Sequence, residues 1–131
     1  MMNARGLILT SGLLVVGACT STARNIELEP VRSHGIDGQL VVRGRHVSGE
    51  LLEASDTAFV MQTGDAIVLV PKFAIDESNF RGLEVHRGAE LSGELLEQHR
   101  LLSRFPMGIP PAALRSLLRQ SGQSELRVIT Q

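Results

Sequence analysis

A short apolar run in the middle of the chain does most to limit the fold. Residues 66–70 read Ala-Ile-Val-Leu-Val and follow the turn pair Gly64-Asp65. A continuous run of this length, rich in β-branched side chains and bounded by turn signals, predicts a strand buried on both faces. The preceding segment, residues 58–63, has a suitable length to pair with it as a β-hairpin. The chain is therefore expected to fold around a sheet.

Other segments extend this sheet. Val47 and Leu51 lie on one face of a predicted strand, and Gly49 stands between them at a place that suits a close approach or a bend. Gly44 predicts a turn before this strand, and the short polar side chains of residues 55–57 predict another after it. The complete set of predicted strands is 26–29, 39–43, 46–53, 58–63, 66–70, 83–86 and 125–130.

Two amphipathic helices are predicted in the C-terminal part of the chain. In the segment 91–105, apolar residues at 91, 95, 102 and 105 share one helical face. Pro110-Pro111 opens a second helix over residues 110–121, because proline in the first turn lacks only an N–H that has no partner, and Gly122 is placed to cap its end. The predicted fold class is α+β: a small, mostly antiparallel barrel or curled sheet with a C-terminal helical hairpin and a closing strand.

Two distant segments of the chain have similar sequences, and we call this similarity the sequence echo. Residues 38–53 (GQLVVRGRHVSGELLE) and 82–97 (GLEVHRGAELSGELLE) align with ten identities in sixteen positions. One interpretation is duplication of a strand-turn-strand unit, and the other is coincidence between a strand and the start of a helix. A solenoid is not indicated, because repeat architectures need about three copies.

The region 38–87 resembles the small, bent barrels of the SH3-like and Sm-like class. It has an early glycine, an aspartate at a turn tip and two short apolar strands. The resemblance implies a fold but no RNA site, because the stacking aromatic and the Arg/Lys-Gly signature of RNA-binding Sm proteins are missing. The chain has no Trp or Tyr and four Phe, which argues against sugar or nucleic-acid platforms built on aromatic stacking.

The N-terminus carries a secretory pattern. Arg5 precedes an apolar run from Gly6 to Gly17, which is shorter than the roughly 20 residues that span a bilayer. Residues 16–19, Val-Gly-Ala-Cys, resemble the bacterial lipobox. The resemblance implies cleavage before Cys19, a diacylglycerol on its sulfur and, in many bacteria, acylation of its amine. The alternatives are a plain signal peptide with an accidental cysteine and a short membrane anchor.

This pattern predicts the organisation of the chain. Residues 1–18 form a signal peptide, 19–25 a lipidated tether and 26–131 a single small domain. The expected location is the bacterial cell envelope, at the outer membrane facing the periplasm. Cys19 is the only cysteine, which excludes disulfides within the chain and, once it is lipidated, a thiol enzyme.

Charge is unevenly distributed along the chain. Between residues 47 and 98 there are ten acidic side chains and three basic ones, whereas from residue 99 onward there are five arginines and one glutamate. Two arginine pairs, each spaced four residues apart, lie in the predicted helices and share a helix face. They are predicted to bind anions such as lipid head groups, to form a solvated face, or to form a face that pairs with the acidic sheet. Exposed ion pairs contribute about 0–1 kcal/mol, so reversing the arginines should barely alter stability. The set is Arg100, Arg104, Arg115 and Arg119.

Known catalytic and cofactor motifs are absent from the sequence. Asp56-Thr57-Ala58 matches the core of aspartic proteases but lacks the surrounding apolar pattern, so a turn role is predicted. The spacing of the histidines indicates no metal site, although His34 and Asp37 could share one ion. Asp76-Glu77, in a predicted loop, lacks the alternating oxygen ligands of a calcium loop. Neither a cofactor nor a metal is predicted.

These observations predict a non-catalytic envelope lipoprotein that binds or scaffolds an envelope protein or anionic head groups near the membrane, with no nucleic-acid partner. Two alternatives stay open: a small membrane-tethered hydrolase or protease, and a carrier of a small apolar ligand. An enzyme should gather titratable groups with shifted pKa values in one cleft. A carrier should have a cavity lined by Leu, Val and Phe, and a scaffold should have neither.

Overall fold

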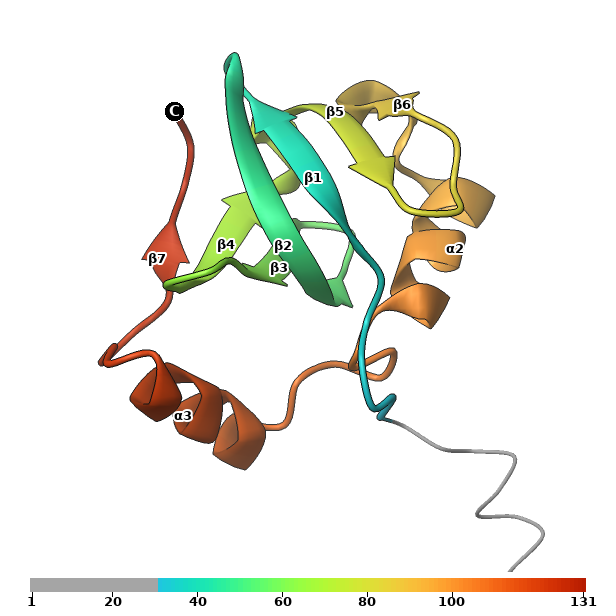
Figure 1. The fold of residues 1–131 in the computed structure, drawn as a ribbon. Helices are drawn as coiled ribbons and strands as arrows, with labels where there is room; N and C mark the ends of the chain where they lie inside the picture. Colours follow the sequence, from blue (N-terminus) through green and yellow to red (C-terminus); the bar gives the residue numbers. More distant parts are fainter. Residues whose placement is uncertain (1–30) are drawn as a thin grey trace, which may run out of the picture. The chain divides into compact units, whose positions relative to one another are not determined.

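The computed structural model describes residues 31–131, which form a seven-stranded sheet with two α-helices (Figure 1). The strand order is β6-β5-β1-β2-β3-β4-β7, and all neighbouring strands are antiparallel except β4 and β7. The predicted α+β class is confirmed, with an open sheet. The strands are β1 (Asp37–Val42), β2 (Arg45–Ala54), β3 (Ala58–Gln62), β4 (Ile67–Pro71), β5 (Ile75–Phe80), β6 (His86–Arg87) and β7 (Arg127–Val128).

Some predictions concern residues that lie outside this range. The signal peptide at 1–18, the lipidated Cys19, the tether at 19–25 and the strand at 26–29 all fall there. Within residues 31–131, no helix has the length and apolar character needed to cross a membrane.

The central hairpins form where the sequence predicts them. β1 turns into β2 through Arg43 and Gly44, whose φ angles of 51° and 82° are both positive, as a tight two-residue hairpin turn requires. At the β3–β4 turn, the Thr63 hydroxyl donates to the Ala66 carbonyl at 3.0 Å and accepts from the Ala66 N–H at 3.1 Å. The run at 66–70 is buried apart from one half-buried leucine. Local turn chemistry therefore defines this part of the sheet.

Gly49 allows β2 to approach β3 closely. A Cβ atom added at this position would lie 2.0 Å from the Gln62 carbonyl oxygen, far inside van der Waals contact. The close approach predicted at Gly49 is therefore confirmed, and a larger residue would force the two strands apart.

Strand β5 is missing from the sequence-based prediction. It pairs with β1 on the side opposite to β2, and a register shift leaves Asp76 without a partner in β1. Because of this bulge, Asp76 and Glu77 are both exposed. Two adjacent polar residues break the alternation by which a half-buried strand is recognised. The predicted loop at Asp76-Glu77 is therefore wrong.

The two copies of the sequence echo take different structures. Residues 38–53 form most of the β1–β2 hairpin, whereas 82–97 contain β6, the 3₁₀ turn η2 (Gly88–Glu90) and the start of a helix. The predicted strand at 83–86 is wrong except for His86, the only one of its residues that pairs with β5. The identical hexapeptides Ser-Gly-Glu-Leu-Leu-Glu at 48–53 and 92–97 are thus a strand in one place and a helix start in the other.

Both predicted helices are present, and one is shorter than predicted. Helix α2 (Gly93–Leu102) ends early because the N–H groups of Arg104 and Phe105 donate to the Leu51 and Leu52 carbonyls of β2, at 3.0 and 2.9 Å. Helix α3 (Pro111–Gln120) matches its prediction closely. Gly122 follows shortly after its end, and its φ of 71° suits the predicted cap.

Buried apolar side chains gather in two clusters. The larger cluster joins the sheet to the end of η2 through Leu91 and to α2 through Leu96, and the smaller cluster joins the sheet to α3 through Leu117 and Leu118. The two helices thus pack against separate clusters. The predicted final strand is present only as β7, which pairs in parallel with β4 at the sheet edge and does not close the sheet.

One histidine of α2 lies inside the core. The His99 side chain is fully buried, with its ring centroid 5.7 Å from that of Phe59 and 5.6 Å from that of Phe80. Its Nδ1 lies 2.6 Å from the Leu95 carbonyl oxygen and must donate to it, while the buried Nε2 has no partner. Burial lowers the pKa of His99 and nearby His86 lowers it further, although the bond to Leu95 opposes this shift.

We expect His99 to make the fold sensitive to acid. Below about pH 6.5 the unfolded chain should bind a proton at His99, whereas the folded chain resists protonation there. The free energy of unfolding should therefore decrease as the pH is lowered, by at most about 1.4 kcal/mol per pH unit. Urea denaturation between about pH 5 and pH 7 measures this slope. His99→Met should flatten it, whereas His46→Gln, at an exposed position, should not. Equal slopes in the parent and His99→Met would contradict this account.

Candidate functional site

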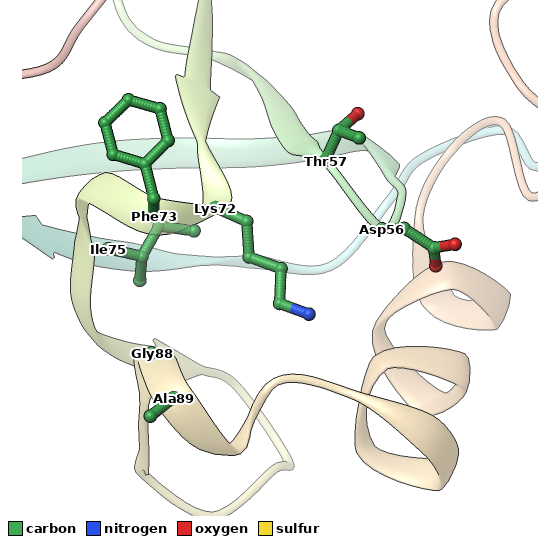
Figure 2. A pocket seen from close by; sticks show the side chains of 7 residues that line it. All are labelled: Asp56, Thr57, Lys72, Phe73, Ile75, Gly88 and Ala89. Atoms are coloured by element: carbon green, nitrogen blue, oxygen red, sulfur yellow. The ribbon is translucent and has the colours of Figure 1, made fainter.

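A hollow of about 770 Å³ lies where the turn after β2 meets the two 3₁₀ turns (Figure 2). The turn η1 (Lys72–Ala74) directly follows β4, and η2 precedes α2. The lining combines a charge of each sign, a hydroxyl group, an aromatic ring and small apolar groups. Its residues are Asp56, Thr57, Lys72, Phe73, Ile75, Gly88 and Ala89.

Short-range contacts hold the walls of this hollow. The Ser55 hydroxyl oxygen accepts from the Ala58 N–H at 3.2 Å, which confirms the predicted turn. The backbone N–H of Lys72 donates to the Thr57 carbonyl at 2.8 Å and so joins η1 to this turn. On the other side, a Cβ added to Gly88 would lie 1.7 Å from the Ile75 carbonyl oxygen, so glycine is needed for η2 to lie against β5.

The hollow presents an unusually exposed aromatic ring. Phe73 is 77% exposed, whereas Ala74, the next residue of η1, is fully buried. Figure 2 shows the Lys72 side chain extending into the hollow, with Asp56 at its far side. Among residues 31–131 neither charge takes part in an ion pair. Both charges and the ring are therefore open to an outside partner.

A second hollow of about 540 Å³ shares Asp56 and Thr57 with the first. Met107, 75% exposed, lies on its wall. Two other wall residues are already engaged: Glu53 accepts from the Ile109 N–H at 2.7 Å, and Arg100 pairs with Glu97 on the same helix. This hollow therefore offers fewer free polar groups than the first.

The four predicted arginines do not form one exposed set. Arg104 lies beyond the end of α2 and is paired with Glu50. Arg100 pairs with Glu97 and also donates to the Pro106 carbonyl. Only Arg115 and Arg119, on α3, are exposed and belong to no ion pair within residues 31–131. Of the predicted alternatives, Arg104 takes the pairing with the acidic sheet, although it lies beyond the helix and its partner is the buried carboxylate of Glu50.

Glu50 and Arg104 form a buried clasp. Arg104 donates through Nε and Nη2 to the two carboxylate oxygens of Glu50, at 2.7 and 2.5 Å, and Nη2 also reaches Gln62 at 3.2 Å. The Gly35 N–H donates to the same carboxylate at 2.7 Å. Burial raises the pKa of Glu50, but these bonds and the charges of Arg104 and His34 outweigh burial and leave the pKa below its usual range. The clasp is a structural site with its polar groups paired.

His34 and Asp37, which the sequence places close enough to share one ion, contact each other directly. His34 Nε2 lies 3.1 Å from an Asp37 oxygen, and His34 Nδ1 lies 3.5 Å from Glu50. In the described part of the chain, no three His, Cys, Asp or Glu side chains are placed to hold a metal ion. Cys19, the predicted lipidation site, lies outside that part.

Sequence reasoning identifies only part of the candidate site. Asp56 and its turn are found from the local polar pattern, but Lys72 and Phe73 are not. A proline followed by lysine and phenylalanine carries no periodic signal, so the exposure of Phe73 depends on a turn visible only in three dimensions. The partners Glu50 and Arg104 stand 54 residues apart and have no local signal at all.

Fold and site together define a small α+β domain with an open, mixed-polarity hollow. No family model, curated protein or solved structure matches the chain.

The clasp predicts unequal effects of two arginine substitutions. Arg104→Gln leaves the buried Glu50 carboxylate without its cation and should lower the free energy of unfolding by about 3–5 kcal/mol. Arg119→Gln removes an exposed charge and should change it by about 0.5 kcal/mol or less. Chemical denaturation of both variants measures the difference. Similar small effects would mean that the clasp does not hold the fold.

Proposed function

We propose that this chain is a non-catalytic binding module anchored in the bacterial cell envelope by a lipid on Cys19. The lipobox-like residues 16–19 and the apolar run before them support the anchor. The proposed location is the outer membrane, with the domain in the periplasm. The proposed activity is capture of a segment of an envelope protein in the hollow beside η1.

The observation that carries this proposal is the exposed ring of Phe73 beside Lys72 and Asp56. A ring that is 77% exposed contributes little to the core, and aromatic side chains are enriched among the residues that dominate protein interfaces. The ammonium and carboxylate in the same hollow can each pair with a group of opposite charge or a backbone amide. These features suit a polypeptide that places an apolar side chain on Phe73 and polar groups on Lys72 and Asp56.

The distribution of shifted pKa values favours binding over catalysis. Among the described residues, four of the groups with shifted pKa values belong to two ion pairs within the domain, and the fifth, His99, lies in the core. Catalytic acids and bases are usually tuned by converging charges in a cleft. The groups with shifted pKa values are Glu50, Glu97, His99, Arg100 and Arg104.

The lining of the hollow favours a polypeptide over a small apolar ligand. A carrier buries most of its ligand in a pocket with predominantly apolar walls. Here the walls include two charged side chains and a threonine, and the Leu and Val residues of the sheet fill the two core clusters instead. The carrier alternative therefore lacks the lining it would need.

Site-specific photocrosslinking tests the binding site. A photoreactive phenylalanine analogue at position 73 of the full chain, in its native membranes, should give a product of one defined mass. Lys72→Glu should remove that product, because it reverses the charge beside the ring. The matched control position is Val85, 53% exposed and absent from the lining. Equal crosslinking at both positions, or a product unaffected by Lys72→Glu, would rule out this hollow as the binding site.

Mass spectrometry tests the anchor. The mature wild-type protein should begin at Cys19 and carry the mass of a diacylglycerol on its sulfur. Cys19→Ser should leave the precursor uncleaved and without lipid. A free Cys19 thiol, or residues 1–18 still attached to the mature protein, would refute the anchor whatever the crosslinking result.

A further inference from the structure

The first described residues lie against the segment that follows α2. The Arg32 N–H donates to the Arg104 carbonyl at 2.8 Å, and the Arg32 guanidinium reaches the Leu101 carbonyl at 3.4 Å. In Figure 1 the coloured trace accordingly begins beside the loop between α2 and α3. The chain therefore enters the domain at the C-terminal end of α2.

The segments that meet here carry exposed apolar side chains. Met107 is 75% exposed, Leu101 50% and Val31 37%. Val31 precedes Arg32, the Leu101 carbonyl accepts from Arg32, and Met107 lines the same hollow as Arg100. We name this set, Val31, Arg32, Arg100, Leu101 and Met107, the N-terminal surface. It combines apolar side chains with two arginines, as membrane-interface segments do.

The length of the connection to Cys19 limits which side of the domain can meet the membrane. Eleven residues lie between Cys19 and Val31, and whatever their conformation the twelve steps from Cys19 to Val31 span at most about 40 Å. A domain of this size has a radius of gyration of about 13 Å, so its width is comparable to the full length of the connection. The N-terminal surface can contact the bilayer while the connection is only partly extended. The opposite side can contact the bilayer only if the connection is fully extended.

We infer that the N-terminal surface rests on the lipid bilayer, with Leu101 and Met107 at the boundary between head groups and acyl chains and Arg32 at a lipid phosphate. This inference rests on the proposed lipid anchor at Cys19. The charge of Arg100 is already neutralised by its pair with Glu97. The apolar side chains are therefore the principal contact, and Arg32 orients the surface. Arg115 and Arg119 are not needed for this contact.

Tryptophan fluorescence can test this orientation cleanly, because the chain has no Trp or Tyr. Leu101→Trp and Met107→Trp are made one at a time in the full-length, lipidated protein and placed on vesicles of phosphatidylethanolamine and phosphatidylglycerol. The matched control is Phe73→Trp, at a position 77% exposed and outside the N-terminal surface. Circular dichroism shows whether each variant keeps the parent fold.

The expected result is a shift of emission to shorter wavelength for tryptophan at 101 and 107, with loss of intensity when the lipids are brominated near the head groups. Tryptophan at 73 should show neither change. If all three positions stay unquenched, or position 73 is quenched as strongly as the others, the inference is overturned while the anchor stands. If mass spectrometry finds no lipid on Cys19, the anchor fails and the inference fails with it.

Discussion

The buried ion pair between Glu50 and Arg104 joins the parts of the domain that no hairpin connects. Glu50 belongs to β2, Arg104 follows α2, and Gly35 adds the segment before β1 through its N–H. The backbone of Arg104 extends the same junction, since it donates to Leu51 and accepts from Arg32. A buried pair is costly to break because either charge left alone in the interior is poorly solvated. The position of the N-terminal surface depends on this junction.

The contrast between predicted and missed elements follows from the range of the interactions that form them. The hairpins around Gly44 and residues 64–65 depend on turn chemistry within a few residues, so the sequence alone indicates them. The end of α2 and the bulge in β5 depend instead on partners far along the chain. Phe105 leaves the helix to pair with Leu52, and Asp76 is exposed because β1 offers it no partner. Such pairings leave no mark in the local pattern.

The candidate site likewise has one part that local sequence predicts and another part that depends on tertiary contacts. The turn at Asp56 is predicted from three polar residues in a row, while the hollow beside it needs η1, the start of β5 and η2 to converge. Arg104 shows the reverse error: its spacing from Arg100 predicts a shared helix face, yet Arg104 lies outside the helix and faces Glu50. Spacing along a helix is informative only as far as the helix extends. The proposed binding role therefore rests on tertiary structure more than on any motif.

The repeated hexapeptide has a consequence for the order in which the domain assembles. Residues 92–97 have the same sequence as 48–53 and could compete for the same place between β1 and β3, but they emerge 44 residues later during synthesis. By that time the earlier copy can already be held in the sheet, because domains assemble from the N-terminal side as the chain appears. The later copy then finds its strand position occupied. Emergence of the chain from its N-terminus thus favours the native pairing of residues 48–53 with β1 and β3. During refolding of the complete chain, both identical hexapeptides are present at once and can compete for this position.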